Sequence, residues 1–159
     1  MPSMFRVGFA LDPEIIRDPP PQYRNPRRVF CPVGIGVGSY VMPGPGWCDL
    51  TGVLLLEWCR AVWQLSAEES RYARLNFFDT PAQVWIRRTP SKWWKVSAIV
   101  RQGNQKRIEA EVLCLPERVE AALLSAAQRF LAGVRAAGVW GVDCEQLAEF
   151  VSEQFEPVA

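Results

Sequence analysis

The first forty residues alternate between strand-like patterns and a proline-rich interruption. Phe5, Val7 and Phe9 alternate with polar or small residues, which is the period of a strand that buries one face. Residues 12–28 carry five prolines among polar residues, so the stretch lacks the amide donors and the periodicity of a regular element. We therefore predict a long surface loop there and a second strand over residues 29–42.

Glycines alternate with aliphatic residues inside that second strand. Ile35 and its aliphatic neighbours point to one face, whereas Gly34, Gly36 and Gly38 leave the other face without side chains. Such a bare strip lets a helix or another backbone approach closely, or it receives a ligand. We favour close packing, because the spacing lacks the Gly-x-Gly-x-x-Gly pattern and the following helix of a dinucleotide site.

The segment after a Pro-Gly-Pro-Gly turn predicts an unusually apolar helix. Asp49 can cap this helix, which runs to about Leu65. Only Glu57, Arg60 and Gln64 interrupt its apolar series, and their spacing places them on one narrow stripe. We therefore expect protein to surround most of the helix, which makes it the centre of the core.

Four short strand-like segments follow, and turn residues separate them. Connections this short force antiparallel pairing. Alternation within the last two strands places Val96, Ala98 and Ile108 on an apolar face and Lys95 and Arg107 on the opposite, polar face. The strands are expected at residues 74–78, 83–88, 93–101 and 106–115.

Two helices are predicted after the strands. Pro116 opens a long alanine-rich helix that Gly138 ends, and Asp143 with Gln146 resembles a capping box at the start of a final helix. Strands and helices are segregated along the chain, which is typical of the α+β class. We predict an α+β fold in which an antiparallel meander packs against the apolar central helix, with two C-terminal helices, as a single domain over residues 1–159.

The net charge conceals an uneven distribution. The chain has 159 residues, of which 49% are hydrophobic, and a formal net charge of +1. Lysine and arginine dominate residues 71–107, where Asp79 is the single acid, whereas acids dominate residues 109–159. Any electrostatic function must therefore be local.

Several kinds of chemistry find little support in the sequence. There is no histidine, which removes the Ser-His-Asp and Cys-His arrangements and histidine metal sites. The five cysteines are scattered without a Cys-x-x-Cys pair, so we expect reduced thiols, including Cys48 beside the acidic Asp49. No segment approaches the roughly 20 apolar residues of a membrane span. We expect a cytoplasmic protein with no metal, no cofactor and no catalytic residues.

The polar face of the predicted sheet is the best candidate for a binding site. Tryptophan beside guanidinium groups attracts protein surfaces and also single-stranded nucleic acid. The alternative is that a terminal helix covers this face, because a domain of this size needs its tryptophans buried. The candidate residues are Trp85, Arg87, Trp93, Lys95 and Arg101.

An acidic stripe on the final helix is the second candidate surface. Glu145, Glu149 and Glu153 recur every four residues, a spacing at which like charges lower helix stability. The stripe is either a solvated face or a contact for a basic partner. A third alternative is an intramolecular contact with the basic strands, which would satisfy both charged surfaces.

The layout of residues 50–100 supplies a family resemblance. A helix containing Leu54-Leu55-Leu56-Glu57-Trp58 precedes a hairpin whose sequence over residues 76–86 is Asn-Phe-Phe-Asp-Thr-Pro-Ala-Gln-Val-Trp-Ile. This helix-then-hairpin layout resembles that of small bacterial immunity proteins of polymorphic toxin and effector systems. The resemblance implies a cytosolic α+β protein that neutralises one toxin domain by occluding it, and it carries over no individual binding residue.

These patterns together predict a protein-binding inhibitor, not an enzyme, whose partner is a toxin or effector domain. A nucleic-acid-binding module that uses the Trp and Arg sheet face is the alternative. Inhibitors of basic nucleases are commonly strongly acidic because they mimic phosphate, and this chain is nearly neutral. Either the acidic final helix supplies the local charge, or the toxin is not a nuclease.

Overall fold

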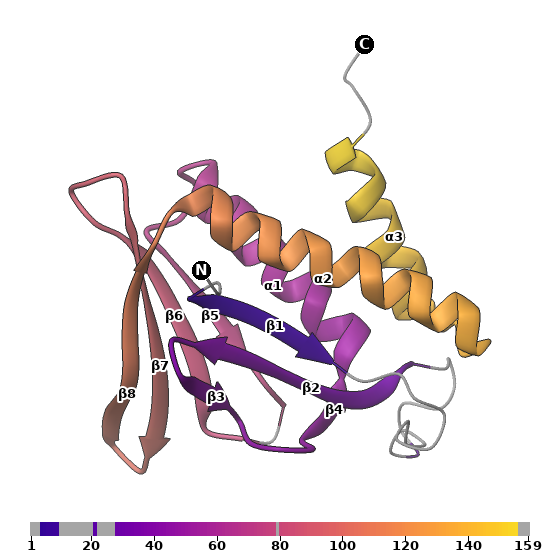
Figure 1. The fold of residues 1–159 in the computed structure, drawn as a ribbon, viewed down its shortest axis with the longest axis horizontal. Coiled ribbons are helices and arrows are strands. Elements are labelled where there is room, and N and C mark those ends of the chain that lie inside the picture. Colours follow the sequence, from indigo (N-terminus) through magenta and orange to yellow (C-terminus); the bar gives the residue numbers. More distant parts are fainter. Residues whose placement is uncertain (1–3, 10–20, 22–27, 79, 156–159) are drawn as a thin grey trace.

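The computed structural model describes residues 4–9, 21, 28–78 and 80–155. It contains two antiparallel sheets and three helices, which confirms the α+β class predicted from the sequence (Figure 1). The proline-rich loop predicted at residues 12–28 lies, apart from residues 21 and 28, outside the described residues. The helices are α1 (Thr51–Ser66), α2 (Pro116–Ala137) and α3 (Val142–Phe155).

The strands form one sheet around β2 and one simple meander. β2 pairs with β1 and β3 through its second half and with β4 through its first residues. The second sheet has the order β5-β6-β7-β8, so neighbours in the chain are neighbours in the sheet, as the short turns predicted. The strands are β1 (Phe5–Phe9), β2 (Phe30–Val37), β3 (Tyr40–Met42), β4 (Cys48–Leu50), β5 (Tyr72–Asn76), β6 (Ala82–Arg88), β7 (Trp94–Gln102) and β8 (Gln105–Cys114).

The prediction of one continuous strand over residues 29–42 is wrong, because the chain turns at Gly38 and Ser39. Gly38 has a φ of +60°, in the left-handed region that favours glycine and that tight hairpins require. β3 consequently folds back against β2. A glycine that looked like one more member of an alternating strip is therefore the turn residue.

Two different groups approach the bare glycine strip. A Cβ atom at Gly34 would lie 3.0 Å from the backbone carbonyl oxygen of Met42 on β3, which is the close backbone approach we expected. A Cβ atom at Gly36 would lie 2.4 Å from the Arg6 guanidinium. A neighbouring strand therefore approaches at Gly34 and an arginine side chain lies over Gly36, and both glycines also line an open hollow of about 460 Å³.

α1 forms the centre of the core, as its apolar sequence predicted. Leu55, Cys59 and Leu65 have no exposed surface, and Trp58 is 1% exposed. Trp58 Nε1 donates a hydrogen bond of 2.9 Å to the Asn76 carbonyl oxygen at the end of β5. This bond fastens the helix to the edge of the second sheet, and it satisfies a donor that would otherwise be buried alone.

Asp49 does not cap α1, contrary to our prediction. The helix begins at Thr51, and its N-cap residue is Leu50 without a side-chain capping bond. The buried Asp49 carboxylate instead accepts hydrogen bonds from the N–H groups of Leu50 and Phe78 and from Trp47 Nε1, at 2.8, 3.0 and 3.0 Å. It ties the start of α1 to the connection between β5 and β6.

The helices lie together on one side of the second sheet (Figure 1). α1 packs against β5, α2 and α3, and α2 packs along β1. α3 lies at the end of the molecule away from β7 and β8 (Figure 1). No helix in the described part of the chain is long and apolar enough to cross a membrane.

Asp143 links α3 to the residue that precedes β2 through a buried hydrogen bond. It lies within the first turn of α3, not in front of it, and its carboxylate accepts hydrogen bonds from Val29 N–H at 3.2 Å and Cys144 N–H at 3.1 Å. Burial raises the pKa of the Asp143 carboxyl. The same carboxylate abuts α1, since a Cβ atom at Gly52 would lie 2.4 Å from Asp143 Oδ2.

The five cysteines are free thiols. Burial raises the pKa of Cys31 to about 11 and the pKa of Cys59 and Cys144 to about 12, which keeps these thiols protonated at neutral pH. Cys48 is more exposed and lies in β4 opposite Pro32.

Candidate functional site

The second sheet has one covered face and one open face. Side chains such as Leu75, Val84 and Val96 point into the core on the covered side. The open side, called here the outer face, carries three rows of side chains that the pairing register aligns across the strands. The rows are Tyr72, Arg87, Lys95 and Leu113; Arg74, Trp85, Ser97 and Glu111; and Asn76, Gln83, Ile99 and Ile108.

The rows enclose a hollow of about 420 Å³ on the outer face. Five basic side chains and a single carboxylate line it, so its potential is positive. Tyrosine, tryptophan and isoleucine side chains supply apolar walls between the charges. The lining residues are Arg71, Tyr72, Arg74, Trp85, Arg87, Arg88, Ser97, Ile99, Lys106, Ile108 and Glu111.

Trp85 is the centre of the hollow, and cations from three other strands surround its ring. The distances to the ring centroid are 4.0 Å from Lys106 Nζ, 4.7 Å from Arg74 Cζ and 5.9 Å from Arg101 Cζ. Each is a cation–π contact that contributes roughly 0.5–1 kcal/mol at an exposed site. Trp85 Nε1 donates a hydrogen bond to Gln83 Oε1 at 2.9 Å, which fixes the ring orientation.

Glu111 is the one acid that lines the hollow, and side chains of β7 already contact its carboxylate. Its carboxylate accepts a hydrogen bond of 2.8 Å from Ser97 Oγ and lies 3.6 Å from Lys95 Nζ. The remaining basic groups therefore face the hollow with little internal compensation. Within the described residues, Arg88 Nη2 and Arg101 Nε are buried and lack a hydrogen-bond acceptor.

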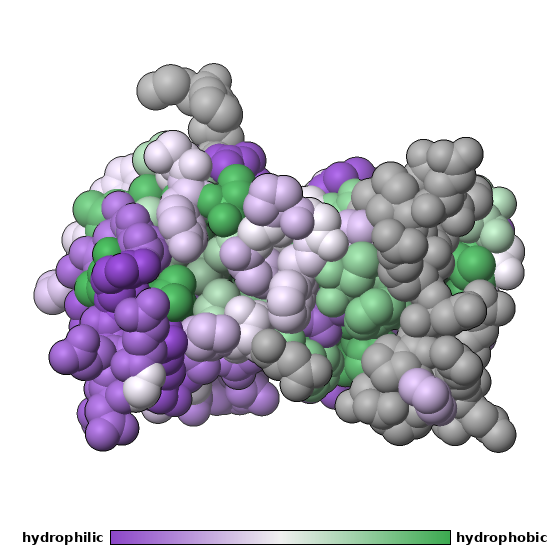
Figure 2. Space-filling view, turned by 90° about the horizontal axis from the view of Figure 1, so that it is seen from below, coloured by the Kyte–Doolittle hydropathy of each residue, from purple (hydrophilic) through white to green (hydrophobic). Residues whose placement is uncertain are grey.

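Apolar side chains lie exposed beside the cations. Tyr72, Ile108 and Leu113 are 51%, 58% and 52% exposed, and all three belong to the outer face. Figure 2 shows strongly hydrophilic side chains at the end of the molecule where β7 and β8 lie, with hydrophobic spots among them. A mixed cationic and apolar surface of this kind is typical of interface centres, where aromatic residues and arginine are enriched.

The structure brings together most of the residues that the sequence selected on the outer face. Trp85 and Arg87 line the hollow, Lys95 lies against Glu111, and Arg101 lies near the Trp85 ring. Trp93 does not line the hollow, since it precedes β7 in the turn, where its carbonyl oxygen accepts a hydrogen bond from Thr89 Oγ1.

A β-bulge changes which residues of β8 reach the outer face. The register shifts between Ala98 and Ile99, so that Ile108 lies opposite Ile99 and Arg107 lies opposite Val100. Ile108 therefore belongs to the outer face and Arg107 to the other side, the reverse of the predicted assignment. Nothing in the local alternation marks this extra residue, because a bulge is a feature of the pair of strands.

The sequence missed five cationic or aromatic members of the hollow, namely Arg71, Tyr72, Arg74, Arg88 and Lys106. Tyr72 and Arg74 lie on β5, and Lys106 lies on β8 beyond the bulge. Each has the period of a strand residue, but only the pairing of β5 with β6 and of β7 with β8 places it beside Trp85. A prediction of which residues pair across neighbouring strands of the meander would have placed Tyr72, Arg74 and Lys106 near Trp85.

The alternative that a terminal helix covers the outer face is wrong for the described part of the chain. α2 packs along β1 and α1, and α3 packs against α1 and α2 (Figure 1). The acidic stripe of α3 is exposed at Glu145, Glu149 and Glu153, where Trp140 Nε1 donates to Glu145 Oε1 at 2.8 Å. Because α3 lies away from β7 and β8, the acidic stripe and the basic hollow do not neutralise each other.

The described residues contain no group of three or more histidine, cysteine, aspartate or glutamate side chains arranged to hold a metal ion. Comparisons with models of known protein families, with curated proteins and with solved structures find no match to this chain. What the hollow offers chemically is a cluster of hydrogen-bond donors and positive charges around an aromatic ring. That combination suits the binding of carboxylates or phosphates beside an apolar group.

Proposed function

We propose that this chain is a protein-binding inhibitor that holds an acidic surface of its partner on the outer face of the β5–β8 sheet. The observation that carries the proposal is the hollow around Trp85, where five basic side chains face one already paired carboxylate. Partner carboxylates would replace solvent around Arg74, Arg87 and Lys106. Bidentate contacts between arginine and carboxylate add geometric specificity to this attraction.

A folded protein suits this surface better than a flexible polyanion does. The exposed side chains of Tyr72, Ile108 and Leu113 offer apolar area that phosphates alone cannot cover. Interfaces concentrate their binding energy in a central aromatic or arginine pocket with a polar rim around it. Trp85 and its surrounding cations would form that centre, and Lys95 with Glu111 would lie at the rim.

The biological role that we propose is neutralisation of a bacterial toxin or effector domain by occlusion. The helix-then-hairpin layout of α1, β5 and β6 resembles that of immunity proteins, and the basic hollow supplies a surface that such a protein would use. An acidic contact surface on the toxin is what this charge requires. A toxin whose substrate is not nucleic acid is the better match, because nuclease surfaces are commonly basic.

A single-stranded nucleic acid is the second candidate ligand. The observation in its favour is a tryptophan among basic side chains, since bases stack on aromatic rings while phosphates contact cations. The Trp85 ring, however, already carries Lys106 and Arg74 within 4.0 and 4.7 Å of its centroid. A base would have to displace a cation before it could stack there, so we rank this function below protein binding.

The proposal is tested by partner capture followed by a growth assay. The wild-type chain is used to recover binding proteins from a lysate of its own host, and each recovered protein is expressed alone and together with the chain. We expect one recovered protein to stop growth when expressed alone and to be neutralised by co-expression. Trp85→Ala and Arg87→Glu should each weaken its binding by about tenfold or more, as expected for an interface centre.

The matched control is Arg135→Glu, which reverses an exposed arginine on α2 whose guanidinium lies 4.8 Å from the Trp140 ring, outside the hollow. This variant should bind and protect as the wild type does. The proposal fails if Trp85→Ala and Arg87→Glu, checked for folding by circular dichroism, still protect cells fully. Tight binding of a labelled single-stranded oligonucleotide that weakens steeply with salt would favour the second candidate instead.

A further inference from the structure

The acidic stripe of α3 is an exposed surface that the proposed function leaves without a role. Glu145, Glu149 and Glu153 are exposed and recur every four residues, so they lie on one side of the helix. None of the three forms an ion pair with a described residue. Like charges at this spacing lower helix stability by a few tenths of a kcal/mol per pair, and a cationic surface placed over them would offset the repulsion.

Apolar side chains lie beside the first carboxylate of the stripe. Val142 is 37% exposed and precedes Glu145 by three residues, so both lie on the same side of α3. The half-buried Trp140 donates its Nε1 hydrogen bond to Glu145 Oε1 at 2.8 Å. α3 therefore presents carboxylates next to apolar area, whereas the outer face of the β5–β8 sheet presents cations next to exposed apolar side chains.

The stripe and the basic hollow of the outer face also agree in length. Glu145 and Glu153 are eight positions apart, or about 12 Å along a helix. The cations around Trp85 come from β5 at one edge of the meander and from β8 at the other, and three strand spacings cover about 14 Å. A helix laid across the four strands would therefore bring its carboxylates over these cations.

The cations of the outer face retain donors for such a contact. Arg74 and Lys106 contact aromatic rings, and a cation–π contact uses the charge without occupying every N–H donor of the group. Arg87 is exposed, and within the described part of the chain it forms neither a hydrogen bond nor an ion pair. A carboxylate that reached these groups would gain charge-assisted hydrogen bonds.

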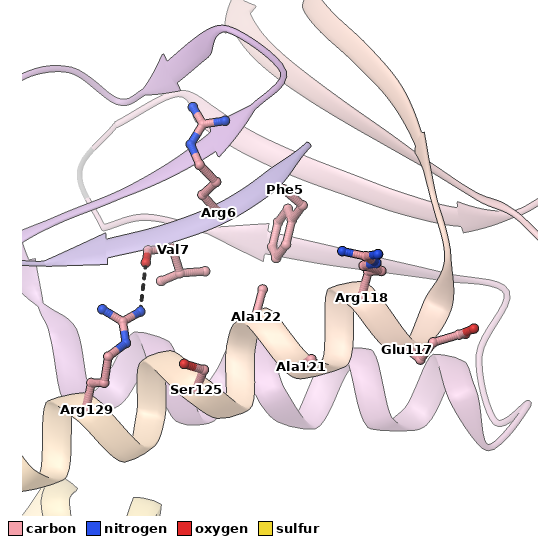
Figure 3. A pocket seen from close by; sticks show the side chains of 9 residues that line it. All are labelled: Phe5, Arg6, Val7, Glu117, Arg118, Ala121, Ala122, Ser125 and Arg129. Carbon is pink, nitrogen blue, oxygen red and sulfur yellow. Dashed lines mark hydrogen bonds between the residues drawn. The ribbon is translucent and has the colours of Figure 1, made fainter. Parts of the chain in front are cut away.

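A second basic hollow, between β1 and α2, is a poorer receptor for the stripe. It has a volume of about 570 Å³, and its basic lining residues are Arg6, Arg118 and Arg129 (Figure 3). Two of these arginines already donate to backbone carbonyl oxygens, Arg6 to Gly38 at 2.8 Å and Arg129 to Val7 at 3.4 Å. The outer face has five basic side chains in its hollow, so it attracts an acidic helix more strongly.

We propose that the chain associates head to tail, with the acidic stripe of one copy on the basic outer face of the next. One such contact leaves a hollow on one copy and a stripe on the other uncovered, so association continues to chains or rings. The attraction acts between exposed charges and therefore weakens with salt. We expect a Kd of about 0.1 mM, so that single chains predominate at the micromolar concentrations of a partner-binding assay.

This inference uses the same outer face as the proposed function. A copy seated there covers the hollow, so that a toxin domain has to displace it, and this regulatory consequence rests on the proposed function. The association itself needs no other protein. Purified chain that stays single would therefore contradict this inference alone, whereas failed partner capture would contradict the proposed function alone.

Sedimentation equilibrium of the purified full chain is the test. At low salt and a protein concentration of about 0.2 mM, we expect a weight-average mass at least about 1.5 times that of one chain. Sodium chloride at about 0.5 M should return the mass to that of one chain. The double variants Arg74→Glu, Arg87→Glu and Glu149→Lys, Glu153→Lys should each stay single. An equimolar mixture of the two should associate again, because an intact hollow then meets an intact stripe.

Arg118→Glu is the control, because it makes the same charge reversal in the hollow between β1 and α2 (Figure 3). It should associate as the wild type does. A wild-type chain that stays single at low salt would overturn the proposal, and so would a mixture of the two double variants that stays single. Association that survives Glu149→Lys, Glu153→Lys would overturn it as well, since the contact would then join two copies without the acidic stripe.

Discussion

Asp143 is a buried carboxylate at the place where α3 meets α1 and the beginning of β2. It is 2% exposed, and its two oxygens accept hydrogen bonds from the N–H groups of Val29 and Cys144. These bonds favour the ionised form, but burial is the larger effect and raises the pKa. The folded chain therefore holds this carboxyl in its protonated form to a higher pH than the unfolded chain does.

The raised pKa of Asp143 predicts a stability that falls as pH rises. Because the folded state binds the proton more tightly, the contribution of Asp143 is greatest below the ordinary carboxyl pKa and declines from there through the raised pKa. Asp143→Asn cannot titrate and should lack this decline. Urea unfolding of both proteins across the acidic range measures the difference, and parallel pH profiles for wild type and variant would contradict it.

At the scale of single residues, the sequence identified several side chains of the candidate site but not the side chains that contact them from neighbouring strands. The period of a strand was enough to select Trp85, Arg87, Lys95 and Arg101, because side-chain direction follows from local alternation. It could not select Arg74, which reaches Trp85 across the pairing of β5 with β6. Contacts between strands depend on register, and register is a property of two segments at once.

At the scale of elements, Gly52 shows how α1 and α3 are fitted together. A glycine inside a helix usually lowers stability by about 1 kcal/mol relative to alanine. At Gly52, however, an added Cβ atom would lie 2.4 Å from Asp143 Oδ2 and 3.2 Å from Asp143 Cβ. The close approach of the two helices therefore requires glycine at this position, and the buried carboxylate cannot move without losing its hydrogen bonds.

We predict that Gly52→Ala destabilises the protein although it improves helix propensity. The loss should be smaller in an Asp143→Ala background, since the carboxylate that the new methyl group meets is then gone. Chemical unfolding of wild type, both single variants and the double variant gives the coupling energy, which we expect to be about 1 kcal/mol or more for residues in contact. Additive effects of the two substitutions would show that the helices adjust freely.

Sequence patterns predicted the helices more accurately than the strands of the first sheet. The apolar run of α1 and the proline and glycine that bound α2 are local signals of helix position, and α2 indeed runs from Pro116 to Ala137 with Gly138 as its left-handed cap. The turn at Gly38 and the short β4 strand were missed. Both depend on which segments meet β2, and the alternation of glycine with aliphatic residues runs up to Gly38, so that the turn residue looks like one more member of the strand.

At the scale of the whole molecule, opposite charges occupy opposite ends. The basic hollow lies on the β5–β8 sheet, and the exposed stripe of Glu145, Glu149 and Glu153 lies on α3. The net charge of +1 therefore describes neither end. A partner approaching through water would be oriented by this separation, because charged surfaces steer association over about one Debye length, roughly 8 Å at physiological salt.

Charge substitutions at the two ends can decide which end meets the partner. If the outer face is the interface, Arg87→Gln should lower the affinity for the captured partner and make the remaining affinity less dependent on salt. Glu149→Gln, which removes one charge from the far end, should leave both quantities unchanged. Kd measured over a series of salt concentrations for wild type and the two variants gives the result.

The comparison is informative because the two substitutions have similar structural costs. Arg87 and Glu149 are both exposed, and glutamine keeps the length and polarity of the side chain at each position. Glu149 has like charges four residues away on both sides, so its removal should slightly stabilise α3, by a few tenths of a kcal/mol per pair. A loss of affinity on Glu149→Gln therefore could not come from unfolding, and it would assign the interface to the acidic stripe instead of the Trp85 hollow.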